Sequence, residues 1–111
     1  MGEIYEDRRQ EPRFTTAGSY RLQTEHSGDL EGRILDLSLN GALLERNSNA
    51  ELQSGARLPV ALEFVGQPPF RGDVLLVRID DAHIGIEFYD MDPQNFAALS
   101  ALIEALTRAH R

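Results

Sequence analysis

Three arginines gather near the start of the chain: Arg8, Arg9 and Arg13, within the stretch EDRRQEPR. Arg9 and Arg13 form an RxxxR pair, and Pro12 disfavours a helical conformation in the residue before it. Guanidinium groups form paired hydrogen bonds with phosphate oxygens, grip the O6 and N7 acceptors of guanine and stack on base faces. This cluster therefore suits a guanine nucleotide, and the simpler alternative is a solvated charge run paired with neighbouring carboxylates.

A second motif, DLSLNG at residues 36–41, has the form DxSxxG. Asp36 can accept hydrogen bonds from the ring N–H and exocyclic amine of guanine, and Ser38 can bond phosphate or backbone. Gly41 allows a ligand to approach the chain closely. The pattern [DN]xSxxG would arise by chance in about one chain in twenty of this composition. Its alternative interpretation is a hairpin turn, since Asn-Gly is a common turn pair and Asp and Ser bond nearby backbone.

Other residue types that support catalysis or metal binding do not form a convincing site. The chain has no cysteine, which excludes disulfides and thiolate chemistry. The three histidines, His26, His83 and His110, have no spacing that places two on one face. Adjacent side chains in Glu25-His26-Ser27 point apart, so a catalytic triad is not expected. We predict no metal site, no catalytic residue, no cofactor and no enzymatic activity.

The charge balance restricts the partners. A formal net charge of -7 repels nucleic-acid backbone and anionic membrane surfaces, so neither is an expected partner. No apolar run is long enough to cross a membrane, and the polar start does not resemble a signal peptide. We expect a soluble, cytoplasmic protein, and its 111 residues suit a single domain.

Period-two patterns predict the elements that must position these motifs. Residues 1–17 lack a sustained period and are expected to form a flexible N-terminal arm that carries RxxxR, ahead of a folded unit at 18–111. The clearest strand alternates Leu58, Val60, Leu62 and Phe64, with Pro59 indicating an edge or strand start. About six strands are predicted, in an antiparallel sheet or small barrel, at 20–24, 32–38, 42–45, 58–64, 70–79 and 82–89. One helical turn is considered at 50–53.

The last segment has helical periodicity. Asp92 is a predicted N-cap and Pro93 a first helical residue. The apolar stripe consists of Phe96, Leu99, Leu102, Ile103 and Leu106. We expect this helix to cover an open side of the sheet, with a dimer contact as the alternative.

With both motifs in place, the sequence resembles the PilZ domains, bacterial receptors for cyclic di-GMP. The resemblance rests on RRQEPR at 8–13, on DLSLNG at 36–41 and on the closing strand IGIEF at 84–88, and it covers about residues 6–106. It implies a mainly β fold, a six-stranded antiparallel PilZ-like split barrel with a C-terminal helix and an arginine-bearing arm. By position, Arg9 and Arg13 match the arginines that hold phosphates and guanine. Asp36, Ser38 and Gly41 match the motif at the other guanine and the backbone.

The resemblance leads to a functional hypothesis. The protein is expected to be a non-enzymatic cyclic di-GMP receptor, whose arm becomes ordered around the ligand and is read by an unidentified protein partner. Arg8 supplies a third guanidinium that could stack on another guanine, which favours an intercalated ligand dimer. The alternative is a type IV pilus-associated interaction module with the PilZ fold that does not bind nucleotide; such a module would lack the arginine motif.

Overall fold

A computed structural model describes residues 18–24 and 28–109 of the protein. The predicted arm with Arg8, Arg9 and Arg13 lies outside the described residues, as does His26. The described elements are strands β1 (Gly18–Gln23), β2 (Asp29–Leu37), β3 (Gly41–Glu45), β4 (Arg57–Glu63), β5 (Phe70–Ile79) and β6 (His83–Tyr89), followed by helix α2 (Pro93–Ala109).

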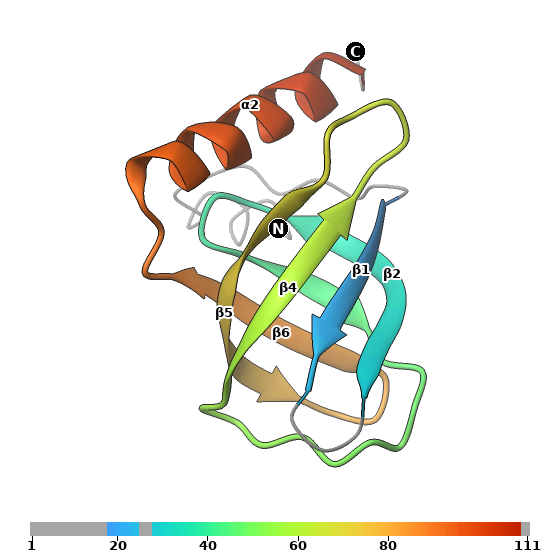
Figure 1. The fold of residues 1–111 in the computed structure, drawn as a ribbon. Coiled ribbons are helices and arrows are strands. Elements are labelled where there is room, and N and C mark those ends of the chain that lie inside the picture. Colours follow the sequence, from blue (N-terminus) through green and yellow to red (C-terminus); the bar gives the residue numbers. More distant parts are fainter. Residues whose placement is uncertain (1–17, 25–27, 110–111) are drawn as a thin grey trace, which may run out of the picture.

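The six strands form a closed antiparallel barrel in the order β1-β2-β3-β6-β5-β4, with α2 lying across one end (Figure 1). Side chains alternate between the interior and solvent, as β1 and β4 illustrate: Tyr20, Leu22, Val60 and Leu62 are buried, whereas their immediate neighbours are exposed or half-buried. This alternation is what one buried face requires of a strand. The prediction of six antiparallel strands with a C-terminal helix is confirmed, and of the two arrangements considered the barrel is the one formed.

Proline and loop residues refine the predicted boundaries. Pro59 is the third residue of β4 and lies just before β4 begins to pair with β1 at Val60. A closed barrel has no edge strand, and this position accommodates a proline at the start of a ladder.

The helical turn considered at 50–53 is absent, so that prediction was wrong. Arg46 bonds the Ala50 carbonyl at 2.9 Å and the Asp80 carbonyl at 3.0 Å, which holds this loop extended against the β5–β6 turn.

Helix α2 begins as predicted, because Asp92 Oδ1 accepts a hydrogen bond of 2.7 Å from the Asn95 backbone N–H. Four members of the predicted stripe are buried: Leu99, Leu102, Ile103 and Leu106. Phe96 is 48% exposed, so its place in the core was wrongly predicted. It lies at the edge of the stripe in the first turn of the helix, where the barrel does not cover it.

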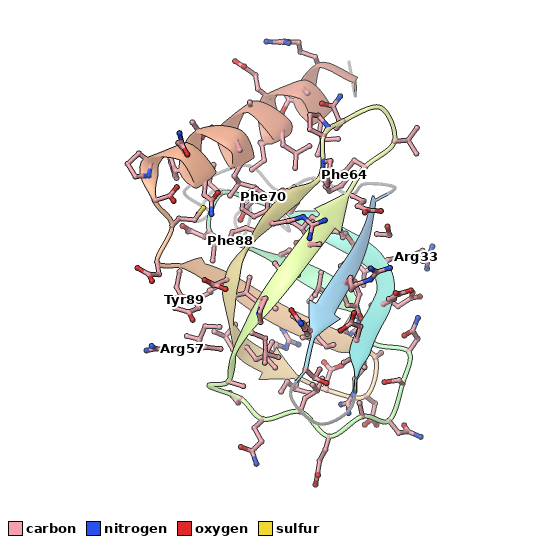
Figure 2. The ribbon with its side chains drawn as sticks, in the orientation of Figure 1. Arg33, Arg57, Phe64, Phe70, Phe88 and Tyr89 are labelled. Atoms are coloured by element: carbon pink, nitrogen blue, oxygen red, sulfur yellow. The ribbon has the colours of Figure 1, made fainter. Side chains whose placement is uncertain are left out.

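The aromatic residues at the helix end of the barrel close the core. Phe64 and Phe70 are buried, and Figure 2 places them with Phe88 on the side facing α2. The Phe70 and Phe88 rings meet edge to face, with centroids 5.6 Å apart. Such pairs contribute about 0.5–1.5 kcal/mol beyond their buried area. The helix therefore covers this end of the barrel over a packed aromatic layer.

The turn between β5 and β6 is organised by one carboxylate. Asp80 Oδ1 accepts hydrogen bonds from the backbone N–H groups of Ala82, at 2.9 Å, and His83, at 2.7 Å. These bonds, Ala82 first, lower the pKa of Asp80 from its ordinary value of 3.8. Asp80 and Asp81 therefore form a hairpin tip, in which Asp80 has a structural role.

We expect Asp80→Asn to lower the Tm near neutral pH. A lowered folded pKa means that the charged carboxylate stabilises the fold above pH 3.8 and loses this contribution as the pH falls through the folded pKa. The Tm of the parent protein should therefore converge on that of the variant below pH 3.8. Circular dichroism melts across this range measure the effect. Asp81→Asn, at the adjacent exposed position, is the control, and a constant Tm difference at every pH would contradict the charge argument.

Candidate functional site

Asp36 lies on the outer wall of the barrel, near the end of β2. The adjacent residue Leu37 is fully buried, so Asp36 faces outward and is half-buried. An irregularity in the β2–β3 pairing falls between Ile34 and Asp36, and Asp36 pairs with Leu43 of β3. A bulge of this kind bends the strand and re-aims the side chain that follows it. The bulge thus places the Asp36 side chain on the outer wall of the barrel, next to the β2–β3 turn.

Ser38 organises that turn from inside. Its side chain is fully buried, and Oγ accepts hydrogen bonds from the backbone N–H groups of Asn40, at 3.3 Å, and Gly41, at 3.4 Å. The Ser38 backbone N–H donates to the Gly41 carbonyl at 2.9 Å. The Ser38 hydroxyl therefore bonds nearby backbone, as the hairpin-turn interpretation of the motif predicted.

Gly41 is required by a close approach of two strands. A Cβ atom at this position would lie 2.0 Å from the Ile86 carbonyl oxygen of β6. The Phe88 backbone N–H also donates to the Asn40 carbonyl at 2.9 Å, which ties the turn to β6. Both the pairing of β3 with β6 and the position of the turn depend on a residue without a side chain here.

The start of β1 lies close to Asp36. Gly18 pairs with Ile34, which is two positions before Asp36 on β2, about 7 Å along the strand. Arg13 precedes Gly18 by five residues, which allows a reach of about 17 Å. Covalent geometry therefore allows RxxxR to meet Asp36, although the arginines themselves lie outside the described residues.

Arg33 and Glu45 form an ion pair on the same wall. Arg33 Nη2 lies 3.2 Å from Glu45 Oε2, and Figure 2 labels Arg33 on the outer side of β2. The hydrogen bond from the Arg33 side chain is the main cause that lowers the pKa of Glu45. Exposed pairs of this kind contribute little to stability. Arg33 is thus already engaged by a carboxylate.

A separate hollow of about 470 Å³ lies on the outer surface of β1, β4 and β5. Arg21, Ala61 and Arg71 line it, and Arg21 Nε is held by Glu31 Oε2 at 2.9 Å. Asp29 and Asp73 also contribute to its lining, so its charges are mixed. This hollow contains none of the motif residues Asp36, Ser38 and Gly41.

The described ranges contain no group of three His, Cys, Asp or Glu side chains suited to a metal ion. Within the same residues, no helix has both the length and the apolar character needed to span a bilayer.

The sequence of this chain matches a known protein family over most of its length. The PilZ domain family matches residues 7–105. The chain belongs to the PilZ domain family. This match extends over both the arginine motif and the DxSxxG turn, so the resemblance found from the sequence is confirmed.

Solved PilZ structures have the same fold. The PilZ domain with c-di-GMP of YcgR from Escherichia coli is 26% identical, with a TM-score of 0.79, covering 94% of this chain and 95% of that one. A structure of YcgR in complex with c-di-GMP is 24% identical with a TM-score of 0.80, covering 94% and 48% of the two chains. The K. pneumonia MrkH–c-di-GMP complex is 19% identical with a TM-score of 0.79, covering 94% and 54%. The chain therefore spans about half the length of the last two proteins.

Among curated proteins, no sequence match was found.

We expect Ser38→Ala to destabilise the PilZ domain by about 1–3 kcal/mol, because the N–H groups of Asn40 and Gly41 would lose a buried acceptor. Urea unfolding measures this difference in the free energy of unfolding. Ser54→Ala, at an exposed loop position, is the matched control and should differ from the parent by less than about 0.5 kcal/mol. Equal stabilities of the Ser38 and Ser54 variants would show that the hydroxyl does not hold the turn.

Proposed function

We propose that this protein is a non-enzymatic receptor for cyclic di-GMP. The observation that carries the proposal is the position of Asp36. Its carboxylate faces outward beside a turn held by Ser38 and Gly41, two positions along β2 from the residue paired with the start of β1. Family membership and the YcgR PilZ domain with c-di-GMP support the choice of ligand.

The two motifs would bind different parts of the ligand. Asp36 would accept hydrogen bonds from the ring N–H and exocyclic amine of one guanine, since an ionised carboxylate only accepts. Arg9 and Arg13 would hold the phosphates and the other guanine through charge-assisted bonds. Ser38 and Gly41 would keep the turn, and therefore Asp36, in place.

Ligand binding would change the order of residues 1–17. Clustered arginines repel one another, and the phosphates of a bound ligand would neutralise this repulsion and tie the segment to the barrel. We propose that an unidentified protein partner reads this change. The mechanism requires no chemical alteration of the ligand. We propose that the receptor acts in the cytoplasm.

Arg9→Ala and Arg13→Ala should each weaken cyclic di-GMP binding ten-fold or more, because a charge-assisted contact contributes about 1.5–3 kcal/mol. Isothermal titration calorimetry measures the affinities. Arg71→Ala, on the outer wall of β5, removes the same charge elsewhere and should bind like the parent. Parent-like affinity of both motif variants would contradict these roles. Absence of binding by the parent protein would favour the pilus-associated interaction module.

Arg8 is expected to recruit a second nucleotide. The parent protein should saturate at two molecules of cyclic di-GMP per chain, because a third guanidinium can stack on a further guanine of an intercalated dimer. Arg8→Ala should reduce this ratio to one. The stoichiometry from the same titrations decides the question, and a parent protein that saturates at one nucleotide would contradict a role for Arg8 in dimer binding.

A further inference from the structure

A row of four residues crosses the outer wall of the barrel from β2 to β5. The pairing registers place Asp36 opposite Leu43, Leu43 opposite Gly85, and Gly85 opposite Arg78. The neighbours Leu37, Ile84 and Ile86 are buried in the core, so the row faces outward. A carboxylate and a guanidinium thus lie at opposite ends of one line across four strands.

The two charged ends share an unusual backbone feature. The β2–β3 register shifts between Ile34 and Asp36, and the β5–β6 register shifts between Leu76 and Arg78. Each charged residue therefore follows directly after an irregularity. Because a bulge redirects the side chain that follows it, the side chains of Asp36 and Arg78 have orientations that regular strands would not give them.

The middle of the row is apolar and flat. Leu43 is half-buried, and Gly85 is itself buried and has no side chain to rise above the sheet. A Cβ atom at Gly85 would lie 3.2 Å from Arg78 Cβ, so the stem of Arg78 occupies the space that glycine leaves. This gives a low apolar surface of the kind on which the face of a purine packs.

Arg78 is available to a ligand. Its side chain is 72% exposed, and its ion pair with Asp80 is long, at 3.8 Å. An exposed pair with this geometry contributes little, because solvent competes for both groups. A ligand acceptor can therefore replace Asp80 at small cost.

We propose that Arg78 contacts the O6 and N7 edge of the guanine whose opposite edge is held by Asp36. The inference rests on the proposed cyclic di-GMP site and adds a residue from the barrel itself. The four strands separate the two Cα atoms by about 14 Å, which leaves room for a base between the side chains. Guanine presents donors on one edge and the acceptors O6 and N7 on the other, so a carboxylate at one end of the row and a guanidinium at the other match both edges.

Arg78→Gln should weaken cyclic di-GMP binding about ten-fold in calorimetry, because a paired guanidinium contact with O6 and N7 discriminates by about that factor. Arg71→Gln, also on β5 but facing the separate hollow, is the matched control and should bind like the parent. Gly85→Ala retains the charge but pushes the Arg78 stem, and should give a smaller loss. Both arginine substitutions are at exposed positions and should leave the Tm unchanged.

A second ligand tests which edge Arg78 contacts. A cyclic dinucleotide of 7-deazaguanine lacks the N7 acceptor, so the parent should prefer cyclic di-GMP, and Arg78→Gln should reduce that preference. If the parent binds cyclic di-GMP but Arg78→Gln binds within two-fold of Arg71→Gln, the role of Arg78 is overturned while the receptor function stands. An unchanged preference in Arg78→Gln would overturn the contact with the guanine edge. A parent protein that does not bind cyclic di-GMP would instead reject the receptor function itself.

Discussion

The antiparallel pairing of β3 with β6 is the constraint on which the rest of the structure depends. It joins residues more than 40 positions apart, Gly41 with Glu87 and Leu43 with Gly85, and without it the six strands could not close. The strands approach so closely that only glycine fits at position 41, where a Cβ atom would lie 2.0 Å from the Ile86 carbonyl oxygen. Closure also removes the unpaired edges that an open sheet would expose.

The DxSxxG motif combines a structural role with a proposed binding role within six residues. Ser38 and Gly41 are buried and hold the β2–β3 turn, whereas Asp36 faces outward after the bulge. The two interpretations of this motif, a hairpin turn and a nucleotide site, are therefore compatible. A carboxylate needs a fixed direction to select a base edge, and in the proposed site the buried Ser38 hydroxyl would supply it by holding the turn.

Much of the fold could be predicted because its causes are local. Alternating apolar residues such as Leu58, Val60 and Leu62 predicted strands, and the Asp92 cap with a 3.6-residue stripe predicted the helix. The errors concern residues whose surroundings are non-local. The segment 50–53 has a composition that permits a helical turn, but Arg46 bonds both the Ala50 carbonyl and the Asp80 carbonyl, 34 positions away, which ties the start of this segment to the β5–β6 turn. Phe96 fits the stripe by spacing, yet the barrel does not extend far enough to cover it.

The sequence by itself determined the strand and helix pattern, the family and the two motifs, since each depends on residues that are close in the chain. Only the tertiary structure decided which outer-wall residues share a line with Asp36. Leu43, Gly85 and Arg78 carry no signal of proximity in the sequence, because their alignment results from three strand pairings and two bulges. A one-residue change of register would turn each side chain to the other face of the sheet, so such a row exists only once the barrel has closed.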